Sequence, residues 1–235
     1  MSLKAVLFDF NGVIINDEPL HEQLIEQVLL SENLRPQPGE FRKICLGRSD
    51  RVCLRELLAN RGRVVSESYL STLIERKAQA YRELWRKKSD QLPIYPGLED
   101  LIFKLTSRNI KLAVVTGAIR AEVELVLNST NLAKYFTAIV AGDDITTSKP
   151  SPDGYLLAVE RLKELYPNTN LQATECLAIE DTPAGIQAAK QAGIAVVGVA
   201  NTYPFHMLQR QANWTVDYLH DLEIERVQKV LREKK

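Results

Sequence analysis

Short apolar segments recur along the chain, and each is bounded by turn residues. They are rich in valine and isoleucine, do not alternate strictly with polar residues, and cover residues 5–10, 110–117, 137–144, 176–181 and 194–200. This pattern is typical of parallel strands that are buried on both faces of a sheet. Amphipathic helical patterns separate the later segments. The sequence therefore predicts an α/β protein whose core is a doubly wound, Rossmann-like parallel sheet.

One connection departs from this alternation. Between Asp17 and Gln91 the apolar residues recur at helical spacing, and no buried-strand pattern interrupts them. Because this stretch follows the first strand, we expect it to lie above the carboxyl ends of the strands, where open α/β sheets bind ligands. The sequence thus predicts a core made of residues 1–16 and 92–235 and an inserted α-helical cap domain made of residues 17–91.

The charge balance and the cysteines narrow the classes of partner and compartment. The 235 residues include 30 lysines and arginines and 30 aspartates and glutamates, so the formal net charge is 0. This composition offers no basic surplus for nucleic acid, and no apolar segment is long enough to cross a bilayer. The cysteines, Cys45, Cys53 and Cys176, form no closely spaced pair, and we expect small buried residues rather than ligands or bridges. We therefore expect a cytoplasmic monomer or weak homo-oligomer with no nucleic-acid or membrane partner.

Chemically active side chains follow four of the predicted strands. They are Asp9, Thr116, Lys149, Glu180 and Asp181. Because the carboxyl ends of parallel strands meet at one edge of a sheet, we expect these side chains to converge in one crevice. A carboxylate nucleophile, a hydroxyl, a lysine and a pair of acids for a hard cation suit phosphoryl transfer. Mg²⁺ takes one or two carboxylates plus phosphate and water, which fits Asp9 and Asp181 better than a zinc site would.

Four segments together resemble a known family. "DFNGVI", "VVTGA", "SKPSPDGY" and "AIEDTPAGI", in this order and with a helical insert after the first, resemble the motifs of the haloacid dehalogenase superfamily. The likeness is closer to its phosphatase and β-phosphoglucomutase-like branch, and it extends to "NDEPLHE" and "GRSDRVCLRELL" in the insert. Each motif alone is weak, but four in order at strand ends are specific.

The resemblance implies a Mg²⁺ site. Asp9 would be the nucleophile that becomes an aspartyl-phosphate. The metal would bind the carboxylates of Asp9 and Asp181 and the backbone carbonyl of Asn11. Glu180 would help directly or through water.

The resemblance also implies how the substrate is held. Thr116 and the N–H of Gly117 would hold the phosphoryl oxygens, and Lys149 would balance their charge. Candidates in the cap could reach the phosphate or hydroxyls of the substrate; they are Glu18, His21, Arg48, Arg51 and Lys77. The alternative for each is a surface charge on a helical bundle, and His21 could equally be a hinge residue that packs against the cap.

One position departs from the family pattern. The residue two after the nucleophile is normally an aspartate that protonates the leaving oxygen and later takes a proton from the hydrolytic water; here it is Asn11. An amide can donate a hydrogen bond but cannot give up or accept a proton at neutral pH. We expect proton transfer to be slower by roughly 10²- to 10⁴-fold. The metal ligand is a backbone carbonyl and would be retained.

Three classes of function remain. The first, which we favour, is a Mg²⁺-dependent phosphatase or phosphomutase that acts on a small phosphorylated metabolite such as a sugar phosphate and is slowed by Asn11. The second is a catalytically impaired protein that binds or senses phosphate and metal. The third is a dehalogenase or phosphonatase. A dehalogenase needs no metal pair such as Glu180 and Asp181, and a phosphonatase needs a Schiff-base lysine that "GRSDRVCL" does not supply.

Overall fold

A parallel sheet forms the centre of the computed structural model, which describes residues 2–87 and 92–233. Within these residues the sheet has six strands in the order β3-β2-β1-β4-β5-β6, and every pair runs parallel. The strands are β1 (Ala5–Phe8), β2 (Lys111–Val115), β3 (Phe136–Val140), β4 (Cys176–Glu180), β5 (Ala195–Val199) and β6 (Trp214–Val216). The predicted doubly wound α/β core is confirmed. The short, half-buried β6 was not predicted, because three residues carry little pattern.

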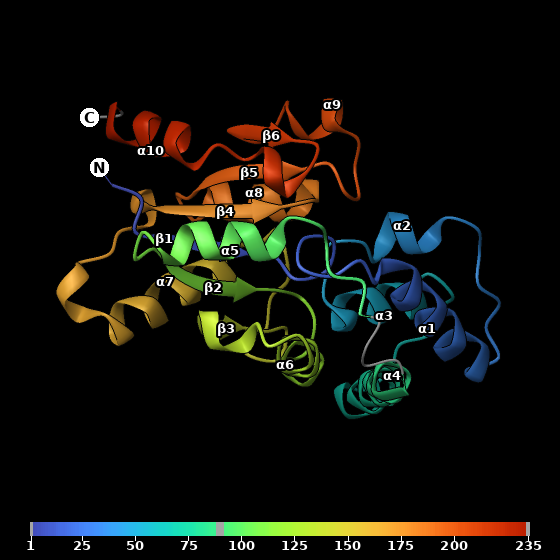
Figure 1. The fold of residues 1–235 in the computed structure, drawn as a ribbon. Helices are drawn as coiled ribbons and strands as arrows, with labels where there is room; N and C mark the ends of the chain where they lie inside the picture. The colour runs from blue at the N-terminus through green and yellow to red at the C-terminus, as the bar shows by residue number, and fades with distance from the viewer. Residues whose placement is uncertain (1, 88–91, 234–235) are drawn as a thin grey trace.

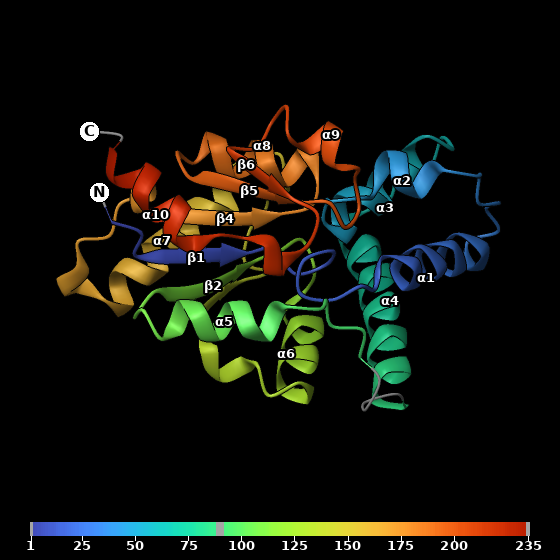
Figure 2. The same cartoon turned by 45° about the horizontal axis from the view of Figure 1, so that its top comes forward.

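Helices cover both faces of the sheet (Figure 2). One face packs against α5 (Leu98–Thr106), α6 (Arg120–Ser129) and α10 (Ile224–Glu233). The other packs against α7 (Asp153–Leu165), α8 (Pro183–Gln191) and α9 (Phe205–Leu208). Single-turn 3-10 helices cover Ala133–Tyr135, Pro167–Thr169, Ala173–Glu175 and Leu219–Asp221.

Successive residues of β1 show why its sequence is continuously apolar. Val6 and Phe8 point into the cluster under α5 and α6, whereas Ala5 and Leu7 point into the cluster under α7 and α8. All four are completely buried. A strand covered on both faces has no solvent side, so no polar residue alternates along it.

The inserted helices form a separate layer beyond the carboxyl ends of the strands (Figure 1). They are α1 (Glu18–Ser31), α2 (Glu40–Ile44), α3 (Asp50–Ala59) and α4 (Glu67–Lys87). Their apolar faces bury a cluster of their own, which includes Ile25, Leu54, Leu57 and Leu73. The helical cap is therefore present. We keep residues 17–91 as its proposed extent; residue 91 lies outside the described residues.

The cap lies directly against the strand ends. The N–H of Ser49 donates a hydrogen bond to Ser148 Oγ at 2.8 Å. At Gly117, a Cβ would lie 3.0 Å from the Ser49 backbone, and at Gly47, whose φ is +75°, it would lie 2.8 Å from Thr182 Oγ1. These two glycines permit the close approach of the cap to the core, so the crevice at the strand ends is roofed by cap residues.

The expectation for the cysteines is wrong for two of the three. Cys45, at the end of α2, and Cys53, in α3, form a disulfide with a Cα–Cα distance of 4.6 Å, whereas Cys176 is free and buried as expected. A search for closely spaced pairs misses a bridge that spans eight residues. Because disulfides are typical of oxidising compartments, the cysteines no longer support the expected cytoplasmic setting.

None of the helices in residues 2–87 and 92–233 combines the length and the apolar character needed to cross a membrane.

Candidate active site

The predicted site residues meet where the strand order of the sheet changes direction. Asp9 follows β1, and Glu180 and Asp181 end and follow β4, the strand that pairs with β1. Open α/β sheets bind ligands at this switch point, because the connections of the two neighbouring strands leave in opposite directions and open a crevice. Thr116, after β2, and Lys149, after β3, line the same pocket as Asp9.

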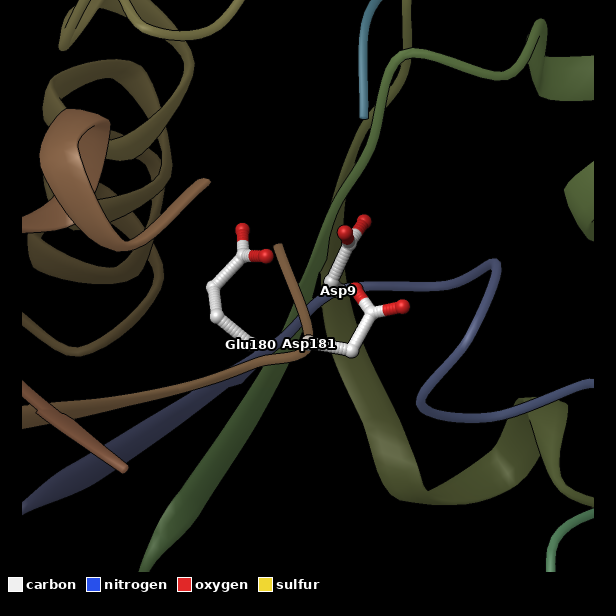
Figure 3. A group of neighbouring side chains, drawn as sticks. All are labelled: Asp9, Glu180 and Asp181. Atoms are coloured by element: carbon white, nitrogen blue, oxygen red, sulfur yellow. The ribbon is translucent and has the colours of Figure 1, made fainter. Parts of the chain in front are cut away.

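Three buried carboxylates are crowded together at this point. One oxygen from each of Asp9, Glu180 and Asp181 lies within 4.8 Å of the others. Figure 3 shows Glu180 and Asp181 extending in different directions from the end of β4, with the Asp9 carboxylate near that of Asp181. Burial and the neighbouring Asp9 carboxylate raise the pKa of Glu180 to about 8, and the same causes raise the pKa of Asp181 well above its ordinary value. This group has more negative charge than its surroundings neutralise.

The carboxylate of Asp181 has no hydrogen-bond partner among the described residues. Both of its carboxylate oxygens are buried and lack a hydrogen-bond partner there, and Glu180 Oε2 also lacks one. Gly12, with φ +78°, leaves room for Asp181: a Cβ at that position would lie 1.8 Å from Asp181 Oδ2. Buried carboxylate oxygens without donors are costly unless a cation or a proton satisfies them. The donor set consists of oxygens, which hard divalent cations prefer.

Lys149 bridges two of the three acids. Its Nζ lies 2.8 Å from Asp9 Oδ1 and 2.6 Å from Glu180 Oε1. Burial acts to lower the pKa of Lys149, but the two carboxylates outweigh it and the pKa is raised, so the lysine stays charged. Tyr155 OH donates to the same Glu180 oxygen at 2.6 Å. Lys149 and Tyr155 both engage one oxygen of Glu180, Oε1, which leaves Glu180 Oε2 and both oxygens of Asp181 without partners among the described residues.

The groups predicted to hold phosphoryl oxygens lie beside Asp9. Thr116 and Gly117 follow β2 and line the same pocket as Asp9 and Lys149. Thr116 is buried, and its Oγ1 accepts a hydrogen bond from the N–H of Ala118 at 3.0 Å, which directs the hydroxyl hydrogen elsewhere. A carboxylate, a hydroxyl and an ammonium group thus face one small space, an arrangement that can hold an anionic tetrahedral group.

Asn11 is held by residues at the start of the cap. Its Nδ2 donates to Asp17 Oδ1 at 2.9 Å and lies 2.9 Å from His21 Nε2. Asp17 is buried and also accepts a hydrogen bond from Tyr81 OH at 2.5 Å. Burial acts to raise the pKa of Asp17, but the charge of His21 and three side-chain hydrogen bonds lower it. The amide of Asn11 therefore points toward an ionised carboxylate at the hinge.

Lys77 occupies a buried ion cluster between cap and core. Its Nζ lies 2.8 Å from Asp50 Oδ2 of α3, 3.2 Å from Glu122 Oε1 of α6 and 2.6 Å from His21 Nδ1. Burial acts to lower the pKa of Lys77, but Asp50 and Glu122 raise it overall. We call Lys77, Asp50, Glu122 and His21 the cap cluster.

The other cap candidates divide between the pocket and the surface. Glu18, His21 and Arg48 line the pocket, and burial raises the pKa of Glu18 to about 7. Arg51 pairs with Glu67 at 2.8 Å on the cap exterior. Among the residues that the structure describes, neither Arg51 nor Lys77 lines the pocket.

Sequence reasoning missed several residues of this region. They are Asp17, Asp50, Tyr81, Glu122 and Tyr155. One signal was available for Tyr81, which follows Lys77 by one helical turn and so shares its face of α4. Tyr155 was present in the quoted "SPDGY" motif, on the first turn of the helix after Lys149.

The arrangement matches a known family. A sequence profile of the haloacid dehalogenase-like hydrolases matches residues 6–199. The chain belongs to this family. The phosphorylated carbohydrates phosphatase of Thermotoga maritima is 30% identical over 202 residues, which cover 85% of this chain and 87% of that protein. Protein CbbY of Rhodobacter capsulatus is 29% identical over 208 residues, which cover 86% and 88%.

Solved structures agree with the sequence relatives. A crystal structure of β-phosphoglucomutase from Clostridium difficile superposes with a TM-score of 0.84 at 26% identity, and the match covers 98% of each chain. The predicted membership of the phosphatase and β-phosphoglucomutase-like branch is confirmed. The chain is an enzyme of the haloacid dehalogenase-like hydrolases with a helical cap.

Proposed function

We propose that this protein is a Mg²⁺-dependent phosphatase that hydrolyses a small phosphorylated metabolite, a sugar phosphate, through an aspartyl-phosphate on Asp9. The observation that carries the proposal is the surplus of buried negative charge beside a lysine. Asp9, Glu180 and Asp181 are grouped together, only Asp9 and Glu180 contact Lys149, and both Asp181 oxygens lack a hydrogen-bond partner in the part of the chain that the structure describes. The name of the Thermotoga maritima relative, a phosphatase of phosphorylated carbohydrates, supports the same substrate class. The net charge of 0 supports the absence of nucleic-acid and membrane partners. We further propose a monomer or weak homo-oligomer.

The residues fit Mg²⁺. The carboxylates of Asp9 and Asp181 and the backbone carbonyl of Asn11 would hold the ion, with Glu180 contributing through water because Lys149 and Tyr155 already engage one of its oxygens. When bound, the ion neutralises charge on the phosphoryl oxygens.

The proposed reaction starts at Asp9. Its carboxylate attacks phosphorus and the bond to the ester oxygen breaks. The departing alkoxide takes a proton from water and leaves as an alcohol, because Asn11 cannot supply one. Thr116 and the N–H of Gly117 donate hydrogen bonds to the phosphoryl oxygens, and Lys149 offsets their charge. Water then hydrolyses the aspartyl-phosphate and regenerates Asp9.

Asn11 slows both proton transfers in this scheme. Its amide cannot exchange protons, and its Nδ2 is engaged by Asp17 and His21. This observation favours a second candidate function, in which the site binds or senses a phosphorylated ligand with little turnover. The two candidates differ in turnover, whereas both require the same phosphate and metal site.

Hydrolysis of p-nitrophenyl phosphate and of a panel of sugar phosphates tests the proposal. We expect release of phosphate that depends on Mg²⁺, stops in EDTA, and is lost in Asp9→Asn. Intact-protein mass spectrometry after addition of acetyl phosphate should show one phosphoryl adduct on the wild type and none on Asp9→Asn. Phosphate binding without turnover and without an adduct would exclude the phosphatase and leave the binding function.

Asp181 provides a test of the metal site that does not depend on turnover. Mg²⁺ should raise the thermal unfolding temperature of the wild type, because it binds the folded state alone. Asp181→Asn should lose this shift and should be more stable than the wild type in EDTA, since it no longer buries an unpartnered carboxylate. A Mg²⁺ shift that survives in Asp181→Asn would remove Asp181 from the metal site.

A further inference from the structure

The wall of the pocket contains the two bridged cysteines. Cys45 and Cys53 line the same pocket as Asp9 and Lys149, and the two cysteines are 5% and 2% exposed. A disulfide exchanges with a thiol only where a thiolate can reach one of its sulfurs. A small dithiol that enters the pocket therefore meets the bridge.

The bridge closes a loop that belongs to the pocket. Residues 46–52 lie between the two cysteines, and we call them the bridged loop. Gly47, Arg48 and Asp50 of this loop also line the pocket. The bridge therefore restrains residues that a ligand in the pocket would contact.

The bridged loop packs against the core beside the phosphoryl and metal groups. The N–H of Ser49 donates to Oγ of Ser148, which directly precedes the lysine of the site. A Cβ at Gly47 would lie 2.8 Å from Oγ1 of Thr182, which directly follows the last of the three acids. A Cβ at Gly117 would lie 3.0 Å from the backbone of Ser49. Movement of the bridged loop would therefore change the surroundings of a bound phosphate.

Apolar packing holds α2 against α3 without help from the bridge. Phe41 and Ile44 of α2 and Leu54 and Leu57 of α3 are buried in one cluster. A bridge across eight residue steps also restrains the unfolded chain less than a bridge across a long loop would. We therefore expect reduction to free the bridged loop while the helices of the cap stay folded.

We infer that Cys45 and Cys53 form a reversible redox site in the wall of the pocket, and that the reduced protein binds its phosphate ligand more weakly than the bridged protein. A freed loop must be ordered again whenever a ligand binds, and the entropy lost in this ordering lowers the affinity. The thiol chemistry depends on the two cysteines alone, whereas the effect on binding rests on the proposed phosphate site.

The reductant is a dithiol, and the reaction is thiol–disulfide exchange. A thiolate of the dithiol attacks Sγ of Cys45, the more exposed of the two residues, and the disulfide bond breaks with its electron pair on Cys53 Sγ. Cys53 takes up a proton. The second thiol of the reagent then attacks the mixed disulfide and releases Cys45, which also takes up a proton. The dithiol loses two electrons and two protons to the protein and becomes a disulfide, and a disulfide oxidant reverses each step.

Kinetics of the two redox states test the effect on binding. The wild type is incubated with oxidised or with reduced dithiothreitol, and maleimide labelling after denaturation should count one free thiol in the bridged protein and three in the reduced protein. For Mg²⁺-dependent hydrolysis of p-nitrophenyl phosphate, reduction should raise KM by about tenfold and change kcat by less than about twofold. Re-oxidation should restore the original KM.

Thermodynamic linkage provides a second measurement that needs no turnover. A ligand that binds the bridged form about tenfold more tightly must favour the bridged form by the same factor. In mixtures of reduced and oxidised dithiothreitol, saturating inorganic phosphate with Mg²⁺ should shift the midpoint potential of the cysteine pair by about 30 mV to a more negative value. A bridge that does not affect binding would show no shift.

Two variants separate the cysteine pair from other effects of the reagent. Cys45→Ala/Cys53→Ala lacks the bridge and should have the higher KM in both buffers. Cys176→Ala is the matched control, because Cys176 is free and completely buried in β4, and it should keep the full redox response. Circular dichroism verifies folding, and the wild type in the two buffers suffices if a variant does not fold.

The outcomes separate this inference from the proposed function. If p-nitrophenyl phosphate is hydrolysed with the same KM in both redox states, or if the bridge stays intact in the folded protein in excess dithiothreitol, the phosphatase stands and the inference is overturned. A redox response in Cys45→Ala/Cys53→Ala, or a midpoint potential that phosphate does not shift, overturns it as well. Absence of Mg²⁺-dependent hydrolysis together with absence of an Asp9 adduct overturns the phosphatase, and the effect of phosphate on the midpoint potential then decides the inference alone.

Discussion

Two buried lysines, one in the core and one in the cap, are built into clusters of similar composition. Lys149 contacts Asp9 and Glu180 at 2.8 and 2.6 Å, and Lys77 contacts Asp50 and Glu122 at 2.8 and 3.2 Å. Each pair of carboxylates raises the pKa of its lysine against the effect of burial. The two clusters nevertheless have different tasks.

The difference lies in the neighbours of each cluster. Beside Lys149 lies a third acid, Asp181, with both oxygens unpartnered within the described part of the chain and with room provided by Gly12. Beside Lys77 lies His21, which fills the remaining contact. The core cluster therefore has negative charge in surplus and can accept a cation and a phosphate. In the cap cluster a single buried oxygen, Glu122 Oε2, lacks a partner among the described residues, against three in the core cluster. One lysine with two acids makes a ligand site or a structural contact according to what surrounds it.

The largest effect is expected from Asn11, which lies where the two regions meet. Asn11→Asp restores a group that can donate and accept a proton, so kcat should rise by roughly 10²- to 10⁴-fold. KM should stay similar or increase, because the new carboxylate adds negative charge beside the phosphate. Steady-state kinetics at saturating Mg²⁺ measures both constants. An unchanged kcat would show that proton transfer by residue 11 does not limit turnover.

The core half of the site could be predicted from the sequence, and the reason is topological. Asp9, Thr116, Lys149 and Asp181 each follow a strand, and parallel strands bring their carboxyl ends to one edge regardless of sequence separation. Locating the strands in the sequence is therefore enough to predict that these residues lie at the same edge of the sheet.

The cap half could not be predicted in this way. Lys77 meets Glu122 only because α4 of the cap packs against α6 of the core, and Asp50 arrives from a third helix. Helical periodicity shows which face of a helix is buried but not which other helix it meets. The Cys45–Cys53 disulfide was missed for the same reason, since it depends on how α2 and α3 are oriented.

Removing each lysine tests whether the clusters differ as described. Lys77→Met should lower the free energy of unfolding by about 3 kcal/mol, because it leaves the buried Glu122 and the partly buried Asp50 without a counterion, and Mg²⁺ should not restore it. Lys149→Met should also be destabilised in EDTA, but Mg²⁺ should recover most of the loss, since its partners belong to the metal site. Urea unfolding with Mg²⁺ and with EDTA gives the four values. Equal recovery of both variants would mean that the two clusters are equivalent.

The disulfide should stabilise the cap by a smaller amount. A bridge between Cys45 and Cys53 closes a loop of eight residue steps, for which chain entropy gives about 2 to 3 kcal/mol. The double variant Cys45→Ala/Cys53→Ala should lose this stability, and dithiothreitol should destabilise the wild type to the same level. The control is the double variant itself, on which dithiothreitol should have no effect. Stability that is insensitive to dithiothreitol would show that the bridge contributes nothing to the folded state.

The smallest effect concerns Glu18, the cap residue whose burial raises its pKa from an ordinary 4.5 to about 7. Between these two values the unfolded chain releases the proton while the folded chain retains it, so ionisation favours unfolding as pH rises. The folded protein therefore has its full stability from protonated Glu18 below about pH 4.5, and it loses this stability as the pH rises to about 7. Glu18→Gln cannot ionise, and its stability relative to the wild type should therefore increase across this window.

We expect a gain of about 1 kcal/mol for Glu18→Gln at pH values above 7, reduced from the full linkage value because the side chain is partly exposed to solvent. Urea unfolding at several pH values measures this gain in stability, and EDTA prevents metal binding from contributing to it. Glu26→Gln, an exposed position on the same helix, is the matched control and should show no pH-dependent difference. A constant difference between Glu18→Gln and the wild type across the window would mean that burial does not raise the pKa of Glu18.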